Sequence, residues 1–475
     1  MQRIFPVIAP WSMCSENEAL DRSSHKELSS FESTLDTYRL LPTKRIPDPS
    51  LCVKKYRRSA AGGGAEIYQH EKNRSMEQLE LTIDFLMCVW SQQKSRMEMH
   101  KALFLQTVNF VDDRIRAVQV DLTKLLGRLN VDERYEIWPR VRRLQATLIR
   151  YNILTHYLLS NLNASKYEWK FAHTALTTSV SSYFSTLEHR DDHIDLKELD
   201  EIMSYASLLH LATVIRAQES AVPSGSSTGQ QCGLTLSDGS GISSLLGLYR
   251  KFLGENTFSN VSKLKKYRWA LDLASEFENG NYLVMLRKLQ DGNESQWRIL
   301  SRCCIAQVLP IIRIELMRQY NKTFGKEEKV PGKDLQYLLH LPSEDAAITF
   351  CEDIGLSIAA SIEGGLRDCV IMKVAPISIS DDSVSRITNP GRSEDSFVFG
   401  RMEWYKEWKE LPNSAWDTEF DREKNESIGA MSSLQKALAK MDISVKTETS
   451  NPDIRVDGDG ILIPPASVLL DIIHP

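Results

Sequence analysis

Apolar residues recur at helical spacing along most of this chain, and short polar turns interrupt them. Between residues 76 and 219 the pattern predicts successive amphipathic helices whose connecting turns carry Gly or Asn. Because short connections keep consecutive helices side by side, we expect an antiparallel stack of helical hairpins with almost no strand. The predicted helices are Met76 to Met99, Ala102 to Arg128, Arg134 to Leu162, Lys166 to Glu188 and Leu196 to Glu219.

A segment rich in Ser, Gly, Gln and Pro interrupts this pattern at residues 221–241. Such a composition buries too little apolar surface to order itself, so it predicts a flexible insert. The helical pattern then resumes, and a left-handed cap is expected at Asn279-Gly280. No strict period of about 34 residues is visible, so we interpret residues 76–325 as an irregular stack resembling tetratricopeptide repeats. The later predicted helices are Leu245 to Leu253, Lys263 to Glu278, Tyr282 to Leu289 and Trp297 to Tyr320.

The pattern changes after residue 325, where two short helices and two strand-like pieces predict a winged helix within residues 333–400. Ser343 is expected to cap the second helix, which should end at Gly355. A helical stack capped by a winged helix is a mainly α, PCI-like architecture. The helices are Leu335 to Leu339 and Glu344 to Glu352, and the strand-like pieces are Val370 to Val374 and Ser396 to Phe399.

The ends of the chain carry weaker patterns. We expect an extended segment at residues 1–75 and a weakly structured tail, rich in tryptophan, at residues 401–475. Within this tail, Trp404 and Trp408 lie one helical turn apart and form a candidate anchor for a partner, because aromatic residues concentrate binding energy. Folding back onto the domain is the alternative interpretation of this pair.

The composition is that of a soluble globular protein of 475 residues, with 42% hydrophobic and 25% charged residues. No apolar run approaches the roughly 20 residues that a membrane-spanning helix needs. The apolar stretch from Ile4 to Pro10 is short and is interrupted by Pro6, so secretion is not expected. The eight cysteines are dispersed and form no CxxC pair, which favours reduced thiols over a zinc ribbon.

The formal net charge is −5, which argues against a surface that binds nucleic acid everywhere but leaves room for a local basic face. Clustered basic side chains could contact phosphates, with Tyr56 or Tyr267 stacking on an unpaired base. A solvated helix face is the alternative interpretation of each cluster. The residues predicted to bind nucleic acid are Lys54, Lys55, Arg57, Arg58, Lys263, Lys265, Lys266 and Arg268.

Few residues suggest catalysis. His189 and His193 lie four apart, the spacing at which adjacent helix turns share a metal, so a metal-dependent hydrolase is one alternative. The segment has no HExxH order, and a solvated polar turn is the simpler interpretation. Cys303 and Cys304 lie in a mostly apolar helix, where thiols pack as small hydrophobes. We therefore predict no catalytic residue, no cofactor and no metal.

Three motifs in the first 122 residues carry a more specific signal. The first begins at Met13, the second runs from Val53 to Gly62, and the third, FVDDRIRAVQVDL, spans Phe110 to Leu122. In this order they resemble the motifs of the SAC/GANP family of mRNA-export scaffolds, and of its short members in particular. In the first motif Ser15 stands where that family usually has Pro, and Ala19 where it has Arg. The matching positions are Met13, Cys14, Glu16, Glu18, Arg22, Val53, Lys54, Tyr56, Arg58, Ala60, Ala61, Gly62, Phe110, Asp113, Arg114, Arg116, Asp121 and Leu122.

The resemblance implies a nuclear scaffold of the TREX-2 type, bound to a second PCI-domain subunit and its small acidic companion, acting in mRNA export at the pore and contacting RNA. Alternatives are a centrosome or spindle regulator of the same family, or a PCI subunit of a proteasome-lid or translation-factor complex. No convincing equivalent of the centrin-binding helix of large family members occurs. The winged-helix residues expected to form both its core and its contact with the PCI-domain subunit are Leu335, Leu338, Leu339, Ile348 and Phe350.

Overall fold

The computed structural model describes residues 8–35, 45–57, 73–91, 97–161, 169–187, 195–220, 264–290, 296–359 and 369–372. These residues are mainly helical, as the sequence predicts. They divide into two compact units within one long helix, between Leu144 and Gln145. We call the described residues up to Leu144 the first unit and those from Gln145 onward the second unit. Among the described residues, no helix combines the length and apolar character needed to cross a bilayer.

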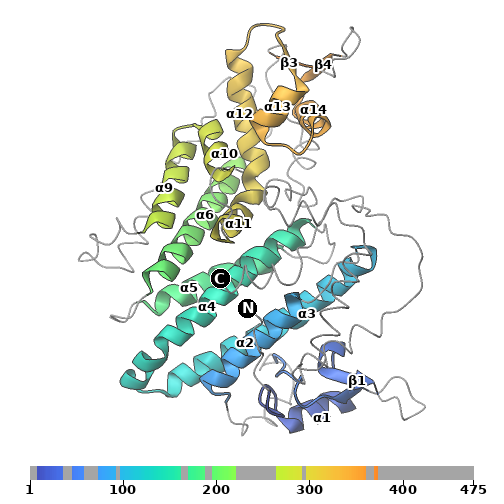
Figure 1. The fold of residues 1–475 in the computed structure, drawn as a ribbon, viewed down its shortest axis with the longest axis vertical. Coiled ribbons are helices and arrows are strands. Elements are labelled where there is room, and N and C mark those ends of the chain that lie inside the picture. The colour runs from blue at the N-terminus through green and yellow to red at the C-terminus, as the bar shows by residue number, and fades with distance from the viewer. Residues whose placement is uncertain are drawn as a thin grey trace, which may run out of the picture. The chain divides into compact units, whose positions relative to one another are not determined.

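The first unit joins a small N-terminal layer to a helical hairpin (Figure 1). The layer contains α1 (Glu16–Ser24), η1 (Ser30–Glu32) and the antiparallel strands β1 (Ser33–Leu35) and β2 (Arg45–Pro47). The hairpin contains α2 (Met76–Ser91) and α3 (Met97–Arg128), which pack against each other, and α4 (Val131–Asn161) follows. The predicted apolar stripe of α3 is confirmed, because its members are buried: Phe110, Val111, Ile115, Val118 and Leu122.

Three helix boundaries in this unit differ from the prediction. The helix expected over Met76 to Met99 ends at Ser91, and the next helix starts at Met97. Helix α4 begins at Val131, because Asn130 and Glu133 form a reciprocal cap. The Asn130 Oδ1 atom accepts the Glu133 N–H at 2.9 Å, and the Glu133 carboxylate accepts the Asn130 N–H at 2.9 Å.

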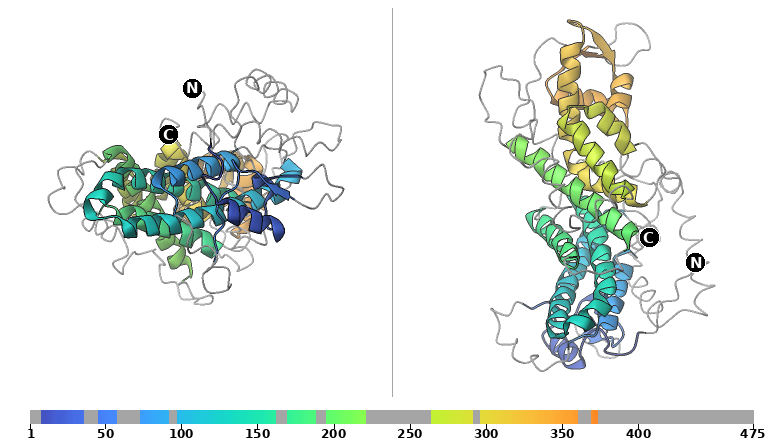
Figure 2. Two further views of the ribbon diagram at one scale, coloured as in Figure 1. Left: turned by 90° about the horizontal axis from the view of Figure 1, so that it is seen from below. Right: turned by 90° about the vertical axis from the view of Figure 1, so that its left-hand side faces the viewer.

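The second unit continues α4 and adds further helices, among which α6 and α9 lie side by side (Figure 1; Figure 2, right). The predicted left-handed cap after α9 is confirmed, since Gly280 has a φ of 70°. The predicted helix Leu245 to Leu253 lies outside the described residues, as do the insert 221–241 and the tail 401–475. The helices are α5 (Trp169–Ser185), α6 (Leu196–Ser220), α9 (Lys265–Glu278), α10 (Tyr282–Gln290), α11 (Gln296–Ile305) and α12 (Leu309–Thr323).

The prediction of a single long helix from Trp297 to Tyr320 is wrong. The chain instead forms α11, a short 3-10 turn η3 (Ala306–Val308) and α12. Pro310 lies in the first turn of α12. Because proline lacks a backbone N–H and clashes with the preceding turn, it is tolerated at a helix start but interrupts a continuous helix.

The second unit ends in a small α/β element. Strands β3 (Lys329–Pro331), β4 (Ser357–Ala359) and β5 (Cys369–Ile371) form an antiparallel sheet in the order β3-β5-β4, with α13 (Gly332–Leu339) and α14 (Glu344–Asp353) between β3 and β4 in sequence. The expected cap of α14 is confirmed, since the Ser343 hydroxyl accepts the Ala346 N–H at 3.1 Å. Strand β5 overlaps the predicted piece at 370–374, whereas the piece at 396–399 lies outside the described residues.

Candidate functional site

The carboxylate of Glu32 lies at the centre of a buried cluster that joins all three N-terminal motifs. Arg22, from the first motif, donates to both carboxylate oxygens at 2.9 and 3.0 Å. The N–H of Val53, from the second motif, donates at 3.1 Å, and Arg114, from the third, donates at 2.8 Å. The side chains of Arg22 and Glu32 are fully buried, so this carboxylate holds three distant segments together inside the first unit.

Side chains of the other two motifs hold the backbone of the second motif at Val53, Lys55 and Tyr56. The N–H of Lys55 donates to the Glu18 carboxylate at 2.8 Å, and the N–H of Tyr56 donates to Asp113 at 3.3 Å. Arg22 also donates to the carbonyl oxygen of Val53 at 3.0 Å. An extended segment has no backbone partners of its own, so these side chains supply them. The acidic residues of the first and third motifs therefore fix the path of the second.

A second buried carboxylate, Asp121 on α3, adds another connection. The Lys54 ammonium donates to its oxygens at 2.9 and 3.1 Å, and the Arg74 guanidinium donates at 2.9 Å. The Arg74 side chain is itself buried and also donates to Thr82 on α2. Lys54 thus has a structural role, because without it the buried negative charge of Asp121 is balanced by Arg74 alone among these two cations.

Neighbouring guanidinium groups keep the Glu32 carboxylate ionised. Burial alone would raise the pKa of Glu32, but the guanidinium groups of Arg114 and Arg22 outweigh it and lower that pKa below its ordinary value. Burial raises the pKa of the neighbouring Cys52 thiol to about 12, so that thiol stays neutral. Neither Glu32 nor Arg74 belongs to a motif. Glu32 closes a local capping box with Ser29, but its charged partners Arg22 and Arg114 lie 10 and 82 positions away, and Asp121 lies 47 positions from Arg74, so no local spacing could have identified these pairs.

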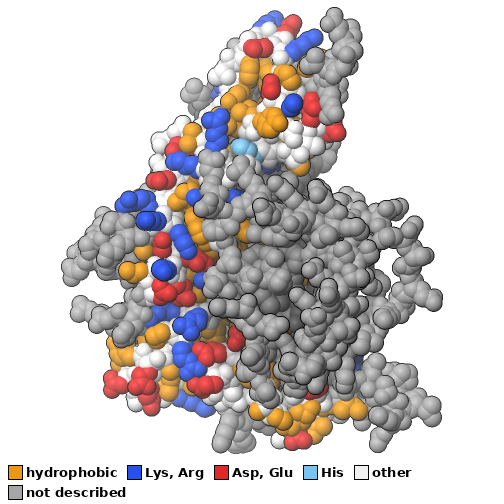
Figure 3. All heavy atoms as spheres, in the orientation of Figure 1, with side chains coloured by type: hydrophobic (Ala, Val, Ile, Leu, Met, Phe, Trp, Pro, Cys, Tyr) orange, Lys and Arg blue, Asp and Glu red, His pale blue; other side chains and the backbone are white. Residues whose placement is uncertain are grey.

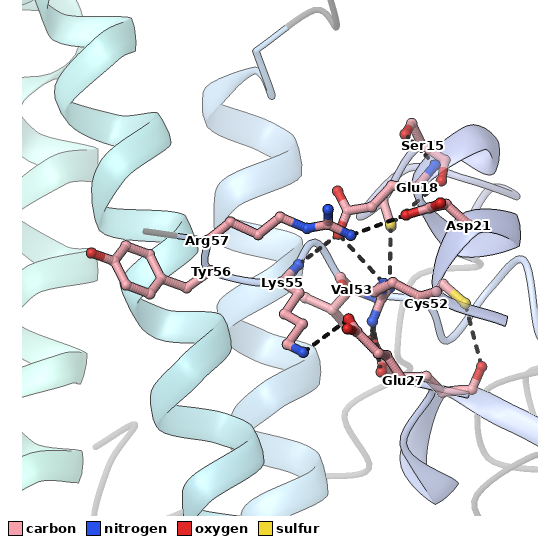
Figure 4. Close-up of polar contacts among 12 residues, drawn as sticks. Ser15, Glu18, Asp21, Glu27, Cys52, Val53, Lys55, Tyr56 and Arg57 are labelled. Atoms are coloured by element: carbon pink, nitrogen blue, oxygen red, sulfur yellow. Dashed lines mark hydrogen bonds and ion pairs between the residues drawn. The ribbon is translucent and has the colours of Figure 1, made fainter. Parts of the chain in front are cut away.

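The structure places three of the four predicted nucleic-acid-binding residues of the second motif beside acidic groups. Besides the Lys54 pair, Lys55 donates to Glu27 at 3.1 Å and Arg57 donates to Asp21 at 3.2 Å. Figure 4 shows Lys55 and Arg57 reaching toward these carboxylates while the Tyr56 ring points the opposite way. The Lys55 and Arg57 pairs are partly exposed, so either can exchange for a phosphate at little cost. Arg58 lies outside the described residues.

The other predicted basic cluster lies in the second unit, at the start of α9. Lys265 and Arg268 are exposed, whereas Lys266 pairs with Glu201 at 3.3 Å. The prediction that Tyr267 stacks on a base is wrong, because its side chain is fully buried in the helix core. Lys263 lies outside the described residues. This cluster and the one containing Lys54 belong to different units.

The structure separates core from surface among the residues predicted to bind a partner. Leu335, Leu339 and Phe350 are buried between α13 and α14, whereas Leu338 and Ile348 are half-buried. No sequence pattern identified Tyr337, whose side chain is 67% exposed and which precedes Leu338. It is the most exposed of the large hydrophobic side chains that the structure describes. Trp404 and Trp408 lie outside the described residues.

Among the residues considered for catalysis, those that the structure describes form no catalytic constellation. His189 and His193 lie outside the described residues, and the described part of the chain has no group of three His, Cys, Asp or Glu side chains arranged to hold a metal. Cys303 and Cys304 line a mostly apolar cavity of about 120 Å³. Burial raises the pKa of the Cys304 thiol, which opposes its use as a nucleophile.

Within a mainly helical chain, the described parts of the three N-terminal motifs converge on the buried carboxylates of Glu32 and Asp121. The family model of the SAC3/GANP family matches residues 13–236 and 249–360, so this chain belongs to the SAC3/GANP family. That family is one of non-catalytic, generally nuclear scaffolds with roles in mRNA export. No curated protein and no solved structure gave a significant match.

Proposed function

We propose that this protein is a non-enzymatic scaffold subunit of a TREX-2-like nuclear complex that acts in mRNA export at the pore. The family match across most of the chain supports the scaffold role. In this proposal the element from β3 to β5 is a winged helix that binds a second PCI-domain subunit, which carries a small acidic companion. Its three antiparallel strands beside two helices agree with such a module.

The observation that carries this proposal is the apolar surface of α13 and α14. Tyr337 is exposed, and Leu338 and Ile348 are half-buried beside the buried Leu335 and Phe350. The buried residues suffice to join the two helices, so the exposed ring is available to a partner. Partly exposed aromatic residues are the side chains that concentrate binding energy when a partner covers them.

We further propose that the assembled complex binds single-stranded RNA without strong sequence preference. Exposed or exchangeable cations in both units support this: Lys55 and Arg57 in the first, Lys265 and Arg268 in the second. Phosphate neutralisation releases counterions, so the affinity should fall steeply with salt.

A tagged pull-down from nuclear extract tests the complex. We expect the wild-type chain to recover a PCI-domain export subunit and its acidic companion, and Tyr337→Glu to lose both. Thr349→Glu places the same charge at an exposed position of α14 and should retain them. Recovery of proteasome-lid, initiation-factor or centrosomal proteins without the PCI-domain export subunit would replace the proposal with one of those alternatives.

A further inference from the structure

Two tryptophans form a partly exposed aromatic corner in the second unit. Trp269 lies on α9 and Trp297 on α11, and both side chains are half-buried. Their ring centroids lie 5.2 Å apart, with ring planes at 89° to each other. Edge-to-face packing of this kind holds both rings in fixed orientations.

Cations line this aromatic corner. The Arg298 guanidinium carbon lies 4.1 Å from the centroid of Trp269 and 4.6 Å from that of Trp297. The Lys266 ammonium lies 5.6 Å from the centroid of Trp297. Arg298 also donates to the carbonyl oxygen of Lys288 at 3.3 Å, which orients its plane. The corner therefore combines indole rings with an oriented guanidinium plane, and bases stack on both kinds of surface.

Exposed positive charge lies directly beside this corner. Lys265 and Arg268 precede Trp269 on α9 by four residues and by one, and both are exposed. Two of the nearby carboxylates are engaged: Asp200 accepts backbone N–H groups of α9, and Glu201 pairs with Arg150 and Lys266. A third, Asp272, lies one turn beyond Arg268 on α9 and is exposed. Figure 3 shows Lys and Arg side chains over α9 and α10, with acidic side chains among them. Phosphates can thus reach cations close to the stacking surface.

We propose that Trp269, Trp297 and Arg298 form a base-stacking site for single-stranded nucleic acid, with Lys265 and Arg268 binding the adjoining phosphates. This site rests on the RNA binding proposed above and gives it a location. An acidic peptide would satisfy the two cations but would make no use of two fixed indole rings. The combination of flat aromatic surface and flanking positive charge therefore favours nucleic acid over an acidic peptide.

Fluorine NMR of the full-length chain containing 5-fluorotryptophan tests this site directly. Trp269→Phe, Trp297→Phe and Trp11→Phe assign three of the resonances, and Trp11 is a matched control because it is a half-buried tryptophan in the first unit. We expect oligouridylate to shift the resonances of Trp269 and Trp297 and to leave that of Trp11 unchanged. If RNA binds without moving those two resonances, this site is refuted while RNA binding stands.

Two further arms distinguish the remaining explanations. Absence of RNA binding by the chain and by its assembled complex would overturn both this site and the RNA binding that it rests on. Equal shifts on titration with polyglutamate would identify a peptide site and overturn the assignment to nucleic acid.

Replacing either tryptophan by Leu should weaken oligouridylate binding about tenfold. The double variant Lys265→Ala, Arg268→Ala should reduce the slope of log affinity against log salt by about 1.4, since each lost contact contributes about 0.7.

Discussion

Asp200 on α6 fixes the start of helix α9 by accepting the backbone N–H of Tyr267 at 2.8 Å, across 67 positions of sequence. Its other carboxylate oxygen accepts the N–H of Lys266 at 3.0 Å. Leu264, which precedes the helix, supplies no side-chain cap. The first turn of α9 is therefore capped by a neighbouring helix instead of by its own N-cap residue.

We predict that Asp200→Ala destabilises the second unit by about 1–2 kcal/mol, the usual cost of losing a helix cap. Urea unfolding followed by circular dichroism measures the change. Asp272→Ala is the matched control, because Asp272 is an exposed aspartate further along α9. Equal stabilities of the two variants would show that this cap contributes nothing.

Glu32→Gln should destabilise the first unit by about 3–5 kcal/mol, because it removes the charge that compensates two buried guanidinium groups. Urea unfolding again provides the measurement. Glu27→Gln removes the partly exposed partner of Lys55 and should change the free energy of unfolding by less than about 1 kcal/mol. A loss for Glu32→Gln as small as that for Glu27→Gln would contradict a central role for this carboxylate.

The lowered pKa of Glu32 predicts a direction for acid unfolding. Its pKa is lower in the folded than in the unfolded chain, so its contribution is present above the ordinary value of 4.5 and is lost as the pH falls through the lower, folded value. Free energies of unfolding measured between neutral pH and acid should decrease over this window. Glu32→Gln should flatten that decrease, and an unchanged profile in the variant would rule out this carboxylate as its source.

The two neighbouring lysines of the second motif should behave differently. Lys54→Met removes one of two charged partners of the buried Asp121 and should cost about 1–3 kcal/mol in the free energy of unfolding. Lys55→Met breaks only a partly exposed pair, so we expect little loss of stability but a flatter salt dependence of RNA binding. If Lys55→Met lost more stability in unfolding than Lys54→Met, and Lys54→Met flattened the salt dependence of RNA binding more, the structural role would belong to Lys55 and the RNA-binding role to Lys54.

Local patterns predicted local structure in this chain. The apolar stripe of α3, the Ser343 cap of α14 and the left-handed turn at Gly280 each depend on residues within a few positions of one another. Pro310 also acts locally, but the mostly apolar helical pattern from Trp297 to Tyr320 predicted one helix where the chain forms two. Strands β3 and β4 are three residues long, too short for an alternating pattern to be recognised.

Long-range contacts explain what the sequence analysis missed in the site. Glu32 and Arg114 are 82 positions apart, so nothing in their spacing predicts that they pair. Lys54 and Lys55 are adjacent and chemically identical. In the described part of the chain, Lys54 pairs with the buried carboxylate of Asp121, whereas Lys55 pairs with the partly exposed Glu27. Tyr267 was the stacking candidate on α9, but packing of α9 against α6 buries its ring, whereas Trp269, which no sequence pattern singled out, is half-buried.

The most direct test of the proposed scaffold is site-specific photocrosslinking at the surface of α13. A photoreactive benzoylphenylalanine in place of Tyr337 should crosslink, in nuclear extract, to a PCI-domain export subunit identified by mass spectrometry. The same residue in place of Thr349 provides the matched exposed position on α14. We predict a PCI-domain adduct at 337 and a much weaker one at 349. An intact complex that gives no PCI-domain adduct at 337 would contradict the assignment of this surface.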